Sequence, residues 1–228
     1  MQKSSTSSFA VLGGFIVIGL TLLGYWIYSA AIDYKMYERS VTVKGLSQRE
    51  FTADIVIWPI QFTVAENDLT ALYTTIDQHS EKIQAYLEKN NIPAHEITIA
   101  APSITDKSAQ QYADAQRAEF RYTAIQTITV YSKKIDTVRG IMGSLSQLGK
   151  QGIVFTGQDY QSQTEYLFTR LNDVKPEMIE EATTMAREVA QKFAKDSQSS
   201  LGKIRRASQG QFSITSRDRN NPHIKQVR

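Results

Sequence analysis

The sequence contains no cysteine, and its 228 residues include three histidines and five prolines. The absence of cysteine excludes disulfide bonds, thiolate metal sites and cysteine nucleophiles. The histidines are His79, His95 and His223, and they form no HxH, HxxxH or HxxE spacing. A histidine metal site would therefore require distant residues to converge, which the pattern does not favour.

Motifs of common enzyme classes are also missing. The sequence has no GxSxG elbow, and Gly149-Lys150 lacks the upstream glycine and the following serine or threonine of a phosphate-binding loop. The acidic cluster Glu177, Glu180 and Glu181 suits the positive end of a helix dipole better than acid–base catalysis. We therefore predict no catalytic residues, no cofactor and no metal site. An enzyme or a small-ligand sensor with an unrecognised site is the alternative.

One long apolar run is present near the N-terminus. Phe9 to Ala31 has no charged residue over 23 positions, about 35 Å as a helix, and a hydrocarbon core is about 30 Å thick. Tyr25, Trp26 and Tyr28 lie at its end, where aromatic rings suit the membrane–water boundary. We predict a transmembrane anchor over 9–31, a cytoplasmic tail over 1–8 and a linker over 32–39.

A cleaved signal peptide is the alternative for this run. Ser29 and Ala31 have the −3/−1 spacing of a cleavage site, and Lys3 supplies a minimal positive segment. The run exceeds the 7–15 apolar residues of a signal core, which favours a retained anchor. Lys35 and Arg39 follow the run and Lys3 precedes it, so charge does not determine the orientation.

Residues 40–228 have the periodicities of a mixed domain of the α+β class. Helical spacing of apolar residues predicts helices from Asn67 to Asn90, from a cap at Asp136 to Leu148, and from Val174 to Asp196. Period-2 alternation predicts strands over 40–44, 51–64, 96–104, 120–130, 153–158, 164–169 and 201–214. Hairpins outnumber parallel crossovers in this order, so we expect about three helices packed on a mainly antiparallel sheet.

Two of these elements carry more specific expectations. The apolar face of 51–64 changes parity beside Pro59, which predicts one long strand with a β-bulge. In the last helix, capped by Asn172 or Asp173, one apolar stripe is expected to face the core. That stripe contains Met178, Ala182, Met185, Ala186, Val189 and Phe193.

The net charge of +3 is unevenly distributed. Residues 203–228 hold seven basic side chains and one acid, Asp218, so this end carries +6 and the remainder −3. Lys203, Arg205 and Arg206 form a candidate patch for an anionic partner, and a solvated strand is the plainer interpretation. Nucleic acid is not expected, because these residues and the aromatic residues lie in different elements.

Four stretches of the soluble part resemble SIMPL-domain proteins. They are RSVTVKGLSQREFTADIVIWPIQFTVAEN (39–67), YLEKNNIPAHEITIAAPSITD (86–106), FRYTAIQTITVYSKKIDTVRGIMGSLSQLGKQGIVFTG (120–157) and EATTMAREVAQKFAKDSQSSLGKIRRASQG (181–210). Together they span about 39–216, and their order and spacing carry the resemblance.

Three departures from the family pattern stand out. Ala53 replaces a common proline before Asp54, and Asn91 replaces a usual glycine before Ile92. The family also ends in a further strand, whereas this sequence stops at Arg228 where that strand would begin. The domain over 40–228 is therefore expected either to be truncated or to have an empty final sheet position, which would expose a strand edge.

The resemblance implies a bacterial envelope protein, anchored or exported, with a loose link to oxidative-stress defence and no established catalytic residues. Some members assemble into ring- or channel-like oligomers. We therefore expect a single-pass inner-membrane protein with a periplasmic domain that acts by self-assembly or partner binding. Its expected partners are inner-membrane lipid, further copies of itself and an envelope protein.

Overall fold

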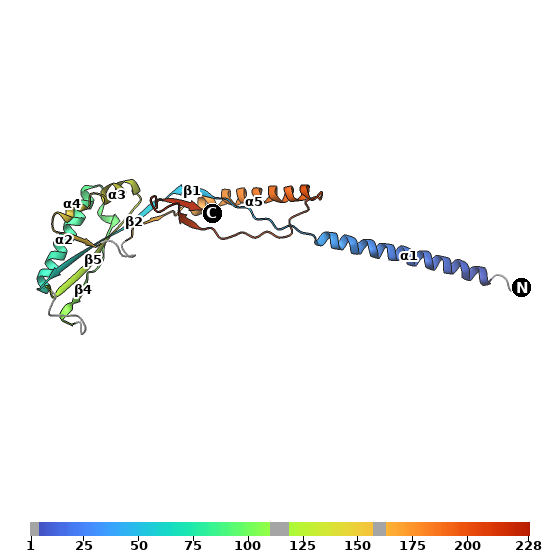
Figure 1. Ribbon diagram of the computed structural model, residues 1–228, viewed down its shortest axis with the longest axis horizontal. Coiled ribbons are helices and arrows are strands. Elements are labelled where there is room, and N and C mark those ends of the chain that lie inside the picture. Colours follow the sequence, from blue (N-terminus) through green and yellow to red (C-terminus); the bar gives the residue numbers. More distant parts are fainter. Residues whose placement is uncertain (1–4, 110–118, 157–162) are drawn as a thin grey trace. The chain divides into compact units, whose positions relative to one another are not determined.

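The computed structural model describes residues 5–109, 119–156 and 163–228 (Figure 1). The chain divides into two compact units. The first comprises residues up to 45 together with 183–204, and the second comprises 46–182 together with 205–228. The end of the strand predicted over 153–158 lies outside the described residues.

The first unit contains α1, Ser5–Glu38. Its stretch Phe9–Lys35 is apolar and long enough to cross a membrane. Its large apolar side chains are exposed, as lipid contact would require. The helix continues beyond the predicted end at Ala31 and through most of the predicted linker.

The larger sheet of the second unit is built on two long strands, β2 (Ile55–Glu66) and β5 (Tyr122–Ser132). Both are antiparallel to every strand they pair with. β3 (Ile97–Ile99) and β4 (Ser103–Asp106) pair with β5, whereas β6 (Val154–Thr156) and β7 (Glu165–Leu167) pair with β2. Short 3₁₀ turns, η1 (Ala94–Glu96) and η2 (Lys107–Ala109), precede β3 and follow β4. The α+β class predicted from the periodicity is confirmed.

Helix α2, Leu69–Lys89, packs on this sheet (Figure 1). Asp68 caps its start, since its carboxylate accepts a hydrogen bond from the Ala71 amide at 2.8 Å. The apolar face of α2 meets alternate residues of β2 and β5. The fully buried residues of this contact are Leu72, Ile76, Ile83 and Leu87 of α2, Val56 and Phe62 of β2, and Ile128 and Val130 of β5. The helix predicted from Asn67 to Asn90 is therefore confirmed. Leu69 and Tyr73, which share its apolar spacing, are exposed.

The second predicted helix is divided into α3 (Ile135–Met142) and α4 (Ser146–Gly149). The expected cap at Asp136 is wrong, because the helix begins one residue earlier. The N-cap is Lys134, whose side chain makes no cap hydrogen bond and whose amide donates to the Ser132 hydroxyl at 3.0 Å. The break follows Met142, at Gly143, where glycine's weak helix propensity favours an interruption.

The predicted β-bulge beside Pro59 is wrong. Pairing of β2 with β5 is continuous there, with Pro59 opposite Thr129. On its other side, β2 pairs with β7 up to Ile57 and with β6 from Gln61, so Pro59 lies between paired segments. The parity change instead marks a passage between sheets, because β1 (Arg49–Thr52) belongs to a second sheet.

This second sheet has the order β1-β9-β8 and is antiparallel. β8 is Ile214–Ser216 and β9 is Ile224–Val227. Residues 224–227, where the sequence was expected only to begin a final strand, form β9, the central strand of this sheet. Residues 40–44 and 201–213, predicted as strands, are extended coil and pair with no strand in the described residues.

Helix α5, Leu171–Asp196, begins before the predicted cap and places Pro176 in its second turn. Its first half closes a smaller core, in which Met178 is 1% exposed. The other members of this core are Phe168, Val227, Phe51, Leu171, Val174 and Phe212. Three further residues of the predicted core stripe, Met185, Val189 and Phe193, are exposed and not part of the core.

Candidate functional site

The three histidines lie apart from one another. His79 packs edge-on against Phe62 of β2 at 6.0 Å, and burial lowers its pKa. His95 lies in η1, and His223 lies in the turn between β8 and β9. Within the described ranges, no group of three or more His, Asp or Glu residues is placed to hold a metal ion.

The acidic cluster of α5 makes structural contacts with the start of β1. Glu181 accepts hydrogen bonds from the Ser47 hydroxyl at 2.8 Å and from Arg49 Nε at 3.2 Å, and Glu177 forms an ion pair with the same arginine. The pKa of Glu181 is lowered by the Ser47 hydrogen bond and by Arg49. Glu180 is exposed. This arrangement joins helix to strand and leaves Glu181 a charged acceptor, not an acid.

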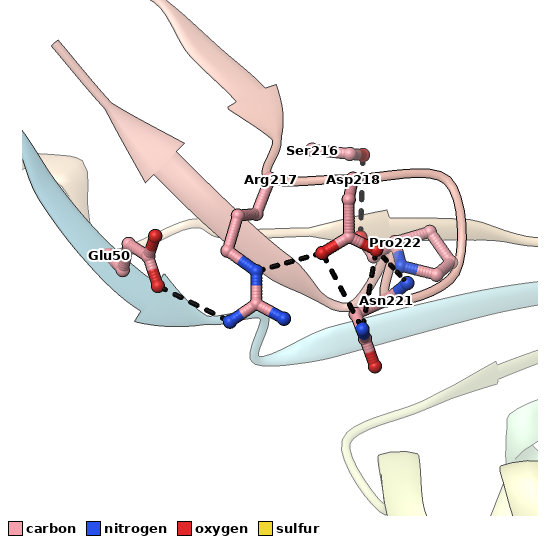
Figure 2. A network of polar contacts seen from close by, with 6 residues as sticks. All are labelled: Glu50, Ser216, Arg217, Asp218, Asn221 and Pro222. Carbon is pink, nitrogen blue, oxygen red and sulfur yellow. Dashed lines mark hydrogen bonds and ion pairs between the residues drawn. The ribbon is translucent and has the colours of Figure 1, made fainter.

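A second polar network stabilises the turn between β8 and β9 (Figure 2). Arg217 donates to Asp218 at 2.8 Å and to Glu50 of β1 at 3.5 Å, and the Asn221 amide donates to Asp218 at 2.6 Å. The Arg217 guanidinium lowers the pKa of Asp218. These groups bond to one another across the turn, so the network is structural.

His223 lies at the end of that turn, against the larger sheet. Its ring packs edge-on against Tyr166 of β7 at 6.0 Å, and Arg139 of α3 lies 3.4 Å from its Nε2. Because an arginine only donates, Nε2 accepts and the neutral ring carries its proton on Nδ1. Nδ1 is buried and has no partner in the described part of the chain. Burial and the Arg139 charge lower the pKa of His223.

Among the described residues, an exposed apolar surface lies on the second half of α5. Met185, Val189 and Phe193, here called the α5 stripe, are 46%, 41% and 57% exposed. Met185 lies seven residues after the buried Met178, about two turns further along the same face. The prediction that this face is core is therefore right for Met178 and wrong for the stripe. Ala182 and Ala186, beside it, are half-buried.

The predicted anionic-partner residues Lys203, Arg205 and Arg206 are all exposed. They lie in the basic arm, defined as residues 200–206, which is extended coil instead of the expected strand. Leu201 and Ile204 are interspersed with them and are 42% and 72% exposed.

Sequence reasoning missed the α5 stripe as a surface. Its apolar periodicity is the same as that of a buried helix face, and nothing in the local pattern distinguishes the two. The alternating pattern of 201–214 likewise predicts a strand whether or not a pairing partner exists. Residues 201–213 pair with no strand in the described part of the chain.

Comparison with known proteins supports the resemblance seen in the sequence. The model of the SIMPL family, described as a protein of unknown function (DUF541), matches residues 41–226. A search among curated proteins found no similar sequence.

Proposed function

We propose that this chain, which belongs to the SIMPL family, is a non-enzymatic membrane-anchored protein that acts by self-assembly. In this proposal α1 is a retained single-pass anchor in the inner membrane. The domain faces the periplasm, where it contributes to envelope defence under oxidative stress. Envelope location, stress defence and oligomerisation are what the family resemblance implies, and the apolar length of α1 supports the anchor.

The exposed α5 stripe is the observation that carries the proposal. Three large apolar side chains spaced by four residues form a continuous ridge on a helix. Covering their exposed parts would contribute roughly 2–4 kcal/mol per copy, since full burial of one such side chain contributes about 1.5–3 kcal/mol. Single exposed apolar residues are ordinary, but an ordered ridge is typical of an interaction surface.

The proposed partner of the stripe is the same stripe on a second copy. Two anchored copies share one membrane, which raises their effective concentration and favours contacts too weak for free diffusion. Self-packing of one ridge is an isologous contact, in which each residue meets its own region in the partner.

Cross-linking of full-length protein in native membranes tests this contact. The chain has no cysteine, so Val189→Cys introduces a unique thiol in the stripe. Gln191→Cys is the matched control, since position 191 is exposed and faces the opposite side of α5. A short thiol cross-linker should give a dimer for Val189→Cys and little for Gln191→Cys. Equal cross-linking at the two positions would refute the contact.

A charge in the stripe provides a second test. Val189→Glu should shift the assembly, measured by cross-linking before solubilisation, toward monomer. Gln191→Glu adds the same charge on the opposite face and should leave the size unchanged. Assembly that survives Val189→Glu at wild-type level would assign oligomerisation, if present, to another surface.

Anchor and orientation are tested separately. The mass of the membrane-bound protein should retain residues 9–31, whereas cleavage after Ala31 would remove them. A thiol at Ser208→Cys should react in intact cells with a maleimide that crosses the outer but not the inner membrane. Labelling that requires disruption of the inner membrane would place the domain in the cytoplasm.

A further inference from the structure

The basic arm leaves α5 in a defined direction. The helix ends in a Schellman turn, in which Gln198 has a φ of 54° and the Ser199 amide donates to the Ala194 carbonyl at 2.8 Å. The Ser197 hydroxyl donates to the Phe193 carbonyl at 2.8 Å and reinforces the turn. The arm therefore starts from an ordered helix end.

Beyond this turn the arm is uncovered. Every residue from 195 to 211 is exposed, and no backbone hydrogen bond is found for residues 200–212 within the described part of the chain. Leu201 and Ile204 are large apolar side chains beside the cationic Lys203, Arg205 and Arg206. A segment in which cationic and large apolar side chains alternate has the composition of a membrane-interface segment.

A short segment joins the anchor to the domain. Residues 39–45, which follow α1, belong to the same compact unit as 183–204. Two residues later, Ser47 bonds to Glu181 of α5. The end of the joining segment is therefore attached to the first half of α5. Ser47 lies nine positions after Glu38, so the chain between them spans at most about 32 Å.

We infer that the basic arm docks on anionic phospholipid headgroups of the membrane that holds α1. Lys203, Arg205 and Arg206 would meet the headgroup phosphates, and Ile204 and Leu201 would enter the interface between them. The inference rests on the proposed membrane anchor. Lipid fits the arm better than nucleic acid, because residues 200–206 contain two large apolar side chains and no aromatic ring for base stacking.

Docking can be followed with a single fluorophore on the full-length protein. Ala207→Cys supplies a unique thiol next to the arm, and an NBD label there reports contact with lipid. The protein is reconstituted in vesicles of phosphatidylcholine alone or with 30% phosphatidylglycerol, each with a headgroup spin-labelled lipid as quencher. We expect quenching in the anionic vesicles, little in the neutral ones, and a marked decrease at 0.5 M salt.

Charge-reversal variants identify the residues responsible. One basic side chain near an anionic surface strengthens contact about fivefold, so Lys203→Glu/Arg205→Glu/Arg206→Glu should weaken docking at least about a hundredfold and abolish the quenching. The matched control reverses three exposed lysines of the second unit, Lys82→Glu/Lys133→Glu/Lys150→Glu. This variant should show the same quenching as the wild type. Ile204→Ser should weaken docking by about tenfold.

The outcomes separate the arm from the anchor. Quenching that is equal in neutral and anionic vesicles, or unchanged by the arm reversal, would overturn the inference. So would an equal NBD response to a soluble polyanion such as heparin in neutral vesicles, which would indicate a polysaccharide-type partner. Protein that alkaline carbonate extracts from the vesicles would refute the anchor, whereas retained protein with an unquenched arm would refute docking alone.

Discussion

At the scale of single residues, Asn91 shows how one backbone angle explains a departure from the family pattern. It has a φ of 67°, in the left-handed region that favours glycine. It is the C′ residue of a Schellman turn at the end of α2, where the Ile92 amide donates to the Leu87 carbonyl at 3.1 Å. Asparagine tolerates this conformation better than other side chains, so it can replace the usual glycine.

Substitution of Asn91 tests this account. Asn91→Ala should lower the free energy of unfolding by about 1 kcal/mol, because alanine is strained at this φ. Asn91→Gly should stay within about 0.5 kcal/mol of wild type, since glycine adopts the angle freely but gains entropy when unfolded. Urea unfolding followed by the fluorescence of the buried Trp58 measures both. Equal losses for the two variants would instead assign the effect to the lost side chain.

Ala53, the other departure within the domain, has a specific role as well. Its amide donates to the His223 carbonyl at 2.8 Å, a bond that the proline common at this position could not make. This bond connects the passage between β1 and β2 to the turn before β9.

At the scale of elements, α5 carries one apolar face in two environments. Its first half covers the smaller core, in which Met178 lies against residues such as Phe168 and Val227. Its second half presents the α5 stripe outward. The same periodicity therefore serves folding in one half and, in our proposal, assembly in the other.

Two methionines on this helix provide a matched comparison. Met178→Ala should lower the free energy of unfolding by about 2–5 kcal/mol, because it leaves a cavity in the smaller core. Met185→Ala, two turns further, should change it by less than about 0.5 kcal/mol under conditions that keep the protein monomeric. Denaturant unfolding in detergent measures both values. A large loss for Met185→Ala in the monomer would mean that the stripe is part of the core.

At the scale of the whole molecule, stability should depend on pH through two histidines. The pKa of His79 is lowered by burial and by Lys82, and that of His223 by burial and by Arg139 and Arg217, against the opposing charges of Asp136 and Asp218. A histidine with a lowered folded pKa binds its proton less well in the folded state. Such a histidine does not affect the free energy of unfolding above its unfolded pKa, about 6.5. As the pH falls from there toward the folded pKa, it lowers the free energy of unfolding increasingly.

We therefore expect the melting temperature to fall between pH 7.5 and pH 5, before carboxylates titrate. His79→Gln and His223→Gln should each flatten this part of the profile, and the double variant should flatten it most. A thermal melt series of full-length protein in detergent measures the slope. At lower pH, Glu181 and Asp218, whose pKa values are lowered, should cause a further loss as they become protonated. An unchanged slope in the double variant would contradict the assignment.

The sequence by itself determined the class and most of the elements. The 23 uncharged residues of the apolar run predict α1, and strict periodicities predict α2 and β5, because these local patterns match one secondary structure each. The family followed from the order and spacing of short stretches along the chain, and the family match over 41–226 confirms it.

Tertiary structure decided what periodicity cannot express. Near Pro59 the apolar residues change from odd to even positions, a pattern that fits a β-bulge and a passage between two sheets equally well. Only the pairing of β1 with β9 distinguishes the two. Strand-like residues at 40–44 and 201–213 stay coil, because a strand needs a partner as well as a pattern. The α5 stripe looks like core in sequence and is surface in the fold, since burial depends on which elements arrive to cover it.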